Sequence, residues 1–377
     1  MSAAQRPRIA VVSDTVHPWF KGGKERRYHE LFQRLADHAD IDVYTMQWWD
    51  GGAVHRDGNI TYHAICPRLD VYVDGRRSIG AALRFALASA RLVRRRFDVL
   101  EADQIPYLPL FVLRIVANVK RARLTASWHE VWDPDYWRSY LGWKGTIASW
   151  IERRAMRLPD EILANSDETG RRLRAELGED APDTVAPLGI DVEAVATAIP
   201  AGSPTDLVVV GRLLAHKRID LLLEAMAILH RVGETVTCRV IGDGPELTRL
   251  IARADALGLA DHVEFRPDVD DHSELYALVK SARLFAFPSE REGFGIALLE
   301  ALACGLPVVT TSAPDNLAVA LAERSERGRV CAPDAPSLAG AIHDSLADGA
   351  GLAAPEEWVV EHDWSAVTRA VQEAMLA

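Results

Sequence analysis

Short apolar runs alternate with helical stretches along the whole chain, and this alternation limits the folds that the chain can adopt. In the first half we expect strands at Arg8–Ser13, Ile41–Met46, Phe97–Ala102, Leu124–Trp128 and Glu161–Ala164. The helices expected between them are Glu25–Ala36, Ile79–Arg96, Thr146–Arg157 and Glu168–Leu177. Strands that alternate with helices are typical of a parallel sheet with helical crossovers. The first half is therefore predicted to form a doubly wound α/β domain.

The alternation restarts after residues 199–204, a segment whose Pro, Gly and Ser indicate a linker. Strands are then expected at Asp206–Val210, Thr237–Ile241, Val263–Arg266, Leu284–Pro288 and Pro307–Thr311. The helices expected between them are Ile219–Arg231, Glu246–Leu257, Ser273–Ser281 and Ile296–Ala303, and Val359–Ala377 is expected as a final amphipathic helix. A chain of 377 residues exceeds one typical domain. We predict two Rossmann-like α/β domains that face a cleft, at residues 1–200 and 205–355, and a C-terminal helix at 356–377.

Charge is unevenly distributed between the two halves. Residues 1–200 hold 28 Lys and Arg against 27 Asp and Glu, whereas residues 201–377 hold 15 against 27. A net charge of -11 argues against a general nucleic-acid-binding protein. The first half still contains basic clusters, at Arg91 with Arg94–Arg96 and at Lys120–Arg123. They could face an anionic membrane or an acidic acceptor, or they could be solvated helix ends.

The four cysteines are far apart in the sequence and lack the paired spacing of a zinc site. The first residues run into a short apolar strand without the apolar region of a signal peptide. The longest apolar stretch, Tyr107–Val119, contains Arg114 and falls short of the ~20 residues that span a bilayer. We therefore expect a cytoplasmic protein without a membrane span.

The segment Pro288–Ala301 has the features of an anion site. A strand is expected to end at Pro288, and a helix is expected to begin near Phe294 after a turn that contains glycine. Free backbone N–H groups at the start of such a helix bind anions. Glu292 and Glu300 would lie about 10 Å apart by helix rise, and each could accept hydrogen bonds from sugar hydroxyls on either side of a diphosphate. The alternative is an ordinary strand-turn-helix.

Two cations follow the first strand of the second half. Arg212 leaves this strand directly after Gly211, and Lys217 opens the next helix. Both are expected at the same sheet edge as the glutamates, because parallel strands end at a common edge. Arginine and lysine both suit phosphate oxygens. Together they predict a site for a diphosphate, although either cation alone could be an ordinary surface residue.

These motifs follow one another in an order that resembles a known family. The order is Gly-Arg-x4-Lys at 211–217, Ile241–Pro245, a Glu-x7-Glu segment at 292–300, and Ala303–Val309. It resembles the retaining glycosyltransferases of family 4, also called glycosyl transferases group 1, which have the GT-B fold. The resemblance implies a nucleoside diphosphate sugar donor and an acceptor that is a saccharide, a lipid-linked saccharide or a small molecule.

The resemblance also implies roles for individual residues. Arg212 and Lys217 would neutralise the diphosphate, Glu300 would hold the ribose, and Glu292 would contact the donor sugar. The remaining donor-binding positions implied are Gly22, Gly23, Gly211, Arg266, Gly293, Phe294 and Gly295. His129 would lie beside the donor sugar at the reaction centre, and the final helix would cross back to the first domain. Arg266 stands where the family often has glycine, so the base of the donor is left open.

The function that we predict is retaining transfer of a sugar to an acceptor hydroxyl, without a cofactor or metal ion. The triplets Asp133–Asp135 and Asp268–Asp270 spell a metal-binding motif, but such triplets are common at turns. Two alternatives remain, a nucleotide-sugar 2-epimerase of the same fold and a non-catalytic nucleotide-binding subunit. The basic clusters and the amphipathic stretch Trp143–Arg157 further suggest a peripheral membrane contact through the first domain.

Overall fold

The computed structural model describes residues 6–20, 22–73, 76–178, 184–269 and 271–376. The chain divides into two compact units. Unit 1 comprises residues Met1–Leu188 and Trp364–Ala377, and unit 2 comprises Gly189–Asp363. Both are α/β units with a central parallel sheet, as the alternation of apolar runs and helical stretches predicts.

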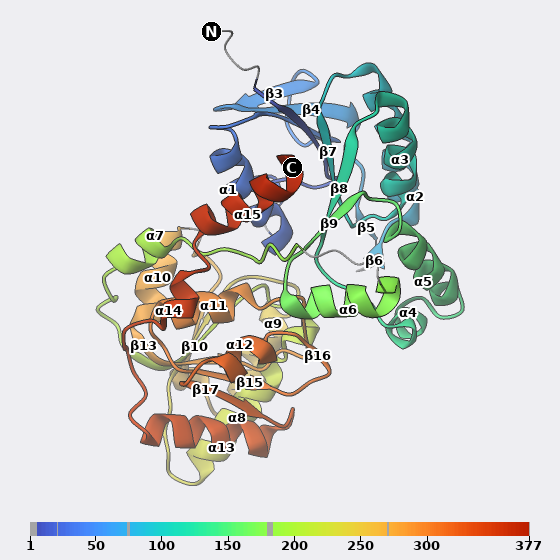
Figure 1. Ribbon diagram of the computed structural model, residues 1–377. Coiled ribbons are helices and arrows are strands. Elements are labelled where there is room, and N and C mark those ends of the chain that lie inside the picture. The colour runs from blue at the N-terminus through green and yellow to red at the C-terminus, as the bar shows by residue number, and fades with distance from the viewer. Residues whose placement is uncertain (1–5, 21, 74–75, 179–183, 270, 377) are drawn as a thin grey trace. The chain divides into compact units, whose positions relative to one another are not determined.

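Unit 1 contains a seven-stranded sheet with the order β3-β4-β2-β1-β7-β8-β9 (Figure 1). Its strands are β1 Arg8–Val12, β2 Asp40–Met46, β3 Val54–Asp57, β4 Ile60–Cys66, β7 Val99–Asp103, β8 Arg123–Trp128 and β9 Glu161–Ala164. All neighbours pair in parallel except β3, which runs antiparallel to β4 at one edge. The short strands β5 Tyr72–Val73 and β6 Arg76–Arg77 form a separate antiparallel ribbon.

The helices of unit 1 cover this sheet. They are α1 Gly23–Leu35, α2 Ile79–Ser89, α3 Leu108–Lys120, α4 Pro134–Leu141, α5 Lys144–Ala155, α6 Asp167–Leu177 and α15 Trp364–Leu376. The apolar stretch that begins at Tyr107 is helix α3, which buries Leu110, Leu113 and Ala117 completely. The helix predicted over residues 79–96 is shorter, because α2 ends at Ser89 and continues as the 3-10 turn η1 Ala90–Arg94.

Unit 2 contains a six-stranded parallel sheet with the order β12-β11-β10-β13-β15-β17. Its strands are β10 Thr205–Val210, β11 Cys238–Ile241, β12 Val263–Arg266, β13 Ala282–Phe287, β15 Val308–Thr311 and β17 Gly328–Cys331. Its helices are α7 Val192–Thr197, α8 Ile219–Arg231, α9 Leu247–Ala256, α10 His272–Lys280, α11 Ile296–Ala303, α12 Val319–Arg324, α13 Ala335–Ala347 and α14 Glu357–Val360. Short pieces complete it, namely η3 Ala215–Lys217, η4 Ala260–His262, β14 Arg291–Glu292 and β16 Asp315–Asn316.

The boundary between the units differs from the one predicted at residue 200. Residues 189–200 belong to unit 2, where α7 packs against α10. The Lys280 ammonium fixes this packing by donating to the carbonyl oxygens of Val195 and Ala198, at 2.5 and 2.9 Å. The linker expected at residues 199–204 therefore lies inside unit 2.

The predicted final helix consists of two helices. A break between Val360 and Trp364 separates α14, which belongs to unit 2, from α15, which packs on α1 and β9 of unit 1. At the break the Ile190 amide donates to the His362 carbonyl at 2.9 Å. Ala377 lies outside the described residues. Within the ranges that the structure describes, no helix is long and apolar enough to cross a membrane.

Candidate active site

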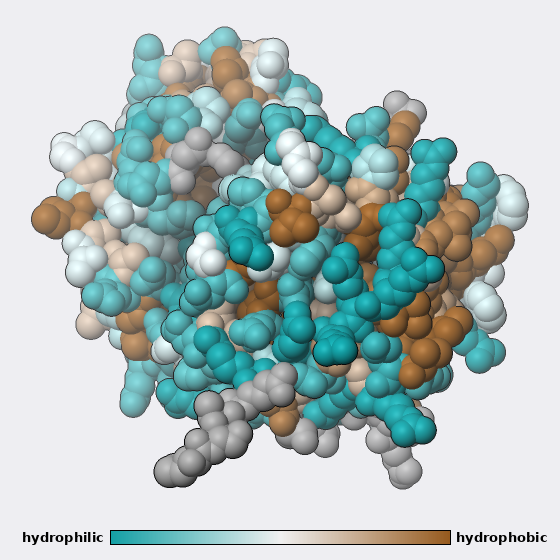
Figure 2. Space-filling view, turned by 90° about the horizontal axis from the view of Figure 1, so that it is seen from above, coloured by the Kyte–Doolittle hydropathy of each residue, from teal (hydrophilic) through white to brown (hydrophobic). Residues whose placement is uncertain are grey.

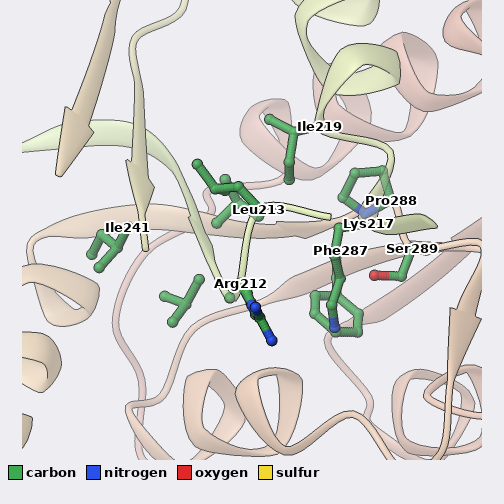
Figure 3. A pocket seen from close by; sticks show the side chains of 11 residues that line it. Arg212, Leu213, Lys217, Ile219, Ile241, Phe287, Pro288 and Ser289 are labelled. Atoms are coloured by element: carbon green, nitrogen blue, oxygen red, sulfur yellow. The ribbon is translucent and has the colours of Figure 1, made fainter. Parts of the chain in front are cut away.

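A pocket lies at the carboxyl edge of the sheet of unit 2, where β10, β11 and β13 end (Figure 3). Polar and apolar side chains line it, and Figure 3 labels Arg212, Leu213, Lys217, Ile219, Ile241, Phe287, Pro288 and Ser289. Gly211 also belongs to the lining. The structure thus brings Arg212 and Lys217 to one pocket, at the sheet edge where ligands of doubly wound sheets bind.

Glycines allow the loops at this edge to contact each other through their backbones. Gly242 has φ +130°, and a Cβ there would lie 2.2 Å from the Gly211 carbonyl oxygen. A Cβ on Gly244 would similarly lie 2.3 Å from the Leu213 oxygen. Both distances are too short for a side chain, so only glycine fits at these two positions. The loop after β11 therefore supports the loop that carries Arg212.

Lys217 is held beside Glu292. Lys217 is the last residue of the 3-10 turn η3. Arg218 follows with a left-handed backbone at φ +51°, and helix α8 begins at the next residue. Lys217 Nζ forms an ion pair with Glu292 Oε1 and lies 5.3 Å from the centre of the Phe287 ring. Both charged side chains are largely buried, at 18% and 11% exposure. The positive charge of Lys217 is therefore partnered by a carboxylate.

Arg212 differs from Lys217 in its surroundings. Its side chain is exposed, and within the described ranges it forms no ion pair. Figure 3 shows its guanidinium extending from the loop after β10. The guanidinium keeps all its donors available for a bidentate contact with an anion.

Helix α11 begins at Ile296, two residues after Phe294. Gly295 precedes it with φ +91°, and a Cβ there would lie 2.4 Å from the Ala318 Cβ. A residue with a left-handed backbone cannot be part of a right-handed helix. The turn that contains Gly293 therefore extends to Gly295, and the helix begins after it. Phe294 is buried, 6.3 Å from the ring of His362, so its side chain has a packing role.

Glu300 lies in the middle of α11 and is 6% exposed. Its Oε1 accepts a hydrogen bond of 3.0 Å from the hydroxyl of Tyr276, a fully buried residue of α10. Tyr276 thus fixes the orientation of this carboxylate. No motif in the sequence indicates this partner, because α10 and α11 come together only in the folded unit.

Arg266 lies at the end of β12, outside the lining of the pocket. Its guanidinium forms hydrogen bonds with Asp268 at 2.9 Å and Glu274 at 2.7 Å. These two carboxylates, first Asp268 and then Glu274, raise the pKa of Arg266 above its usual range. The Arg266 charge is therefore compensated, unlike that of Arg212.

The two glycines expected near the donor lie at the start of α1 in unit 1. Gly22 is the N-cap residue, in extended conformation, and Gly23 is the first residue of the helix. A Cβ on Gly22 would lie 2.4 Å from Glu25 Oε2. Glu25 is buried, and its Oε1 accepts a 2.6 Å hydrogen bond from the Thr15 hydroxyl. Because Gly22 has no Cβ, the Glu25 carboxylate can turn back over the loop and occupy this space.

His129 directly follows strand β8 of unit 1 and is largely buried, at 13% side-chain exposure. Its backbone amide donates to Gln104 Oε1, and its carbonyl accepts a 3.2 Å hydrogen bond from the Thr169 hydroxyl. Its Nε2 lies 3.4 Å from Asp103 Oδ1. The ring is therefore held next to a buried carboxylate at the carboxyl edge of the first sheet.

A charged cluster that the sequence did not predict surrounds this position. It consists of Asp14, Lys24, Glu25, Arg77 and Asp103. Lys24 Nζ lies 2.5 Å from Asp103 Oδ2, 3.3 Å from Asp14 Oδ1 and 3.6 Å from Glu25 Oε1. Arg77 forms a second ion pair with Asp14. The sequence signal for Asp103 is its charge at the end of an apolar strand, but this signal does not indicate Lys24, Asp14 or Arg77 as its neighbours.

The cluster shifts the pKa values of its members. Burial by itself would lower the pKa of Lys24, but the carboxylates of Asp103, Asp14 and Glu25 outweigh it and hold that pKa above its usual range. Burial would raise the pKa of Asp103, but Lys24 and His129 hold it well below its usual range. Lys24 and Asp103 are therefore both charged at neutral pH.

The aspartate triplets considered as metal ligands have other contacts. The carboxylate of Asp133 caps helix α4 by accepting a 2.7 Å hydrogen bond from the Asp135 amide, and Asp135 forms an ion pair with Arg138. Asp268 binds Arg266, and Asp270 lies outside the described residues. Over the described ranges, no group of three or more His, Cys, Asp or Glu is arranged to hold a metal ion.

Two family models match the chain. "Glycosyltransferase Family 4" matches residues 21–194, and "Glycosyl transferases group 1" matches residues 197–359. Among curated proteins, a glycogen synthase of Mycobacterium tuberculosis is 30% identical over 239 residues, which are 61% of this chain and 56% of that protein. A D-inositol 3-phosphate glycosyltransferase of Segniliparus rotundus is 31% identical over 216 residues, 54% of this chain and 43% of that protein. The matches thus span about half the length of these relatives.

Solved structures with the same fold cover nearly the whole chain. A sucrose-phosphate synthase from Thermosynechococcus elongatus superposes with a TM-score of 0.72 at 19% identity, covering 98% of this chain and 95% of that one. Anabaena HepE in complex with UDP and glucose superposes with a TM-score of 0.71 at 19% identity, covering 98% and 99%. At these identities the likeness concerns the fold.

Proposed function

Because the chain belongs to the glycosyltransferases of group 1 and family 4 and has the GT-B fold predicted from its sequence, we propose that it is a retaining enzyme. It transfers a sugar from a nucleoside diphosphate sugar to an acceptor hydroxyl. The observation that carries the proposal is the pocket at the carboxyl edge of the sheet of unit 2, which exposed Arg212 and the largely buried Lys217 both line. A diphosphate matches two cations at such an edge.

Neutralising the departing diphosphate is the central task of this site. Arg212 offers a planar fork, and Lys217 offers a point charge that exchanges Glu292 for a phosphate oxygen. Backbone N–H groups at the start of α11, after Gly293–Gly295, add hydrogen bonds. In this scheme no metal ion or other cofactor is needed.

The two glutamates hold hydroxyl groups of the donor. Released from Lys217, Glu292 accepts hydrogen bonds from the sugar. Glu300, oriented by Tyr276, accepts them from the ribose.

We assign acceptor binding to unit 1, where His129 and the loop at Gly22–Gly23 lie near the charged cluster. Free Cys66, Cys238, Cys304 and Cys331 support a cytoplasmic location.

Retention follows from the roles given to these groups. The acceptor oxygen forms its bond to the anomeric carbon on the face from which the diphosphate leaves. The bond from that carbon to the phosphate oxygen breaks, and the acceptor proton moves to an oxygen of the leaving diphosphate. An inverting enzyme would need a base on the opposite face, and in this scheme both glutamates bind hydroxyl groups instead.

The test is a donor screen followed by product analysis. A panel of nucleotide sugars is incubated with the protein, with and without acceptors that include an α-glucan and inositol phosphate, after the names of the relatives. We expect nucleoside diphosphate release that rises with acceptor, and the anomeric proton coupling of the product should match that of the donor. Full turnover without acceptor would indicate a 2-epimerase, and binding without turnover a non-catalytic subunit. An inverted product would refute the scheme.

A further inference from the structure

Three helices of unit 1 each leave a stripe of apolar side chains exposed. On α2 the stripe is Ile79, Leu83 and Leu87, on α3 it is Ile115 and Val119, and along α5 it is Trp143, Ile147 and Trp150. Their exposed fractions range from 50% to 75%. Spacings of three or four residues place the members of each stripe on one side of their helix. We call these eight side chains the apolar face.

The three stripes belong to neighbouring helices, because α3 packs against both α2 and α5. Figure 2 shows hydrophobic residues gathered at the right of the view, the side on which Figure 1 places α2, α3 and α5. Single exposed apolar residues are common on protein surfaces, but a gathered set marks an interaction site. The apolar face is therefore a candidate docking surface.

The segments that carry the apolar face are strongly basic. Residues 79–96, 108–123 and 143–157 together contain thirteen Arg and Lys and a single carboxylate, that of Glu152, which is 1% exposed. Arg94, Arg96 and Arg121 are exposed, and each has no ion pair within the described ranges. Three of the thirteen cations, Arg114, Arg123 and Arg153, form ion pairs with carboxylates outside these segments. The surroundings of the apolar face still carry an excess of positive charge.

Two tryptophans of the apolar face lie next to cations. Lys144 Nζ is 5.9 Å from the centre of the Trp143 ring, and the Arg154 guanidinium is 5.6 Å from that of Trp150. These tryptophans are 75% and 57% exposed, so neither contributes to the core. Tryptophan beside Lys or Arg is favoured where an apolar phase meets water, as at lipid headgroups.

We propose that the apolar face docks on an anionic lipid surface. Such a surface offers negative headgroups to the arginines and lysines and an apolar layer to the tryptophans, leucines and isoleucines. A second copy of the chain would bring two surfaces with an excess of positive charge together, which disfavours self-association through this face. A nucleic acid would match the charge and leave the apolar stripes in water. The proposal does not rest on sugar transfer.

The test is co-sedimentation of the full chain with vesicles of phosphatidylcholine alone or mixed with phosphatidylglycerol. We expect pelleting with the anionic vesicles at low salt, little with the neutral ones, and release as salt increases. The double variants Trp143→Ser/Trp150→Ser and Arg94→Glu/Arg96→Glu should each lower the apparent affinity by at least about tenfold. The matched control, Arg231→Glu/Val232→Ser, changes an exposed cation and an exposed apolar residue of unit 2 and should bind like the unaltered chain.

Several outcomes would overturn the proposal. One is no pelleting with anionic vesicles at low salt, and another is equal binding to neutral vesicles. A third is unaltered binding of both variants, with circular dichroism confirming that they are folded. A lipid-free dimer in sedimentation velocity that the Trp143→Ser/Trp150→Ser variant converts to a monomer would assign the face to a second copy of the chain.

Discussion

Lys24 Nζ and Asp103 Oδ2 lie 2.5 Å apart, and both side chains are largely withdrawn from water. Lys24 comes from the first turn of α1, and Asp103 ends strand β7, so the pair joins a helix to a strand at the carboxyl edge of the first sheet. The other oxygen of Asp103 lies 3.4 Å from His129 Nε2. Lys24 therefore compensates the charge of the carboxylate that faces His129.

Removing Lys24 should destabilise unit 1. The variant Lys24→Met leaves the buried carboxylate of Asp103 without its main cation and removes one of the two cations beside Asp14, at a cost of about 3 to 5 kcal/mol. Urea unfolding followed by circular dichroism measures the loss, and Lys144→Met, at an exposed lysine, is the control. The double variant Lys24→Met/Asp103→Asn should recover part of the loss. Strictly additive effects would show that the two groups are not coupled.

Glu152 should make the stability of unit 1 depend on pH. Burial raises its pKa to about 7, although Trp137 and Tyr107 donate hydrogen bonds to it. The folded state therefore binds a proton that the unfolded state has lost, and this group's contribution falls as pH rises from about 4.5 to 7. The total decrease is about 3 kcal/mol.

The variant Glu152→Gln should lose this pH dependence. Its free energy of unfolding should increase relative to that of the unaltered chain between pH 5 and pH 8. Glu373→Gln, at an exposed position of α15, should leave the dependence unchanged. Parallel pH profiles for the unaltered chain and Glu152→Gln would contradict the raised pKa.

Arg212→Ala and Lys217→Ala should each weaken binding of a nucleoside diphosphate. Loss of a charge-assisted contact with a phosphate costs about 1.5 to 3 kcal/mol, or roughly 10- to 150-fold in affinity. Isothermal calorimetry with a panel of nucleoside diphosphates measures this change. Arg249→Ala, which removes an arginine already paired with Glu246, is the control. Unchanged affinity in either variant would place the diphosphate elsewhere.

Tyr276→Phe tests the orientation of Glu300. Losing the 3.0 Å hydrogen bond should cost about 1 kcal/mol of unfolding free energy and should weaken nucleotide binding by roughly fivefold. Calorimetry and urea unfolding report the two effects, with Tyr72→Phe, at a half-exposed tyrosine of unit 1, for comparison. Lower stability with full nucleotide affinity would mean that Tyr276 has only a packing role.

Sugar transfer should continue in excess chelator, because Arg212 and Lys217 are expected to neutralise the diphosphate. The measurement is the initial rate with EDTA against that with added magnesium or manganese. A metal-dependent transferase assayed in parallel controls for incomplete chelation. If the transfer rate falls to near zero with EDTA and recovers with magnesium or manganese, then Arg212 and Lys217 do not neutralise the diphosphate by themselves.

The sequence predicted the central strands of both sheets because continuous apolar runs belong to strands buried on both faces. It did not predict β3, β4 or β17. In β3 and β4, polar residues such as His55 and His63 interrupt the apolar pattern. Arg212 and Lys217 were found because both lie close to one strand end. The cluster around Lys24 and Asp103 was not predicted, because its members lie on separate elements, among them α1, β6 and β7, that only the fold brings together.

The ion pair between Lys217 and Glu292 means that an anion entering the pocket meets a cation that already has a partner. Chloride or another monoanion gains little by replacing a carboxylate at that position. In the proposed scheme a diphosphate displaces Glu292 and also reaches the exposed guanidinium of Arg212, and this second contact offsets the lost interaction. If the proposed diphosphate site is correct, the pocket selects by the number of negative charges, and the abundant small anions of the cell are poor competitors for it.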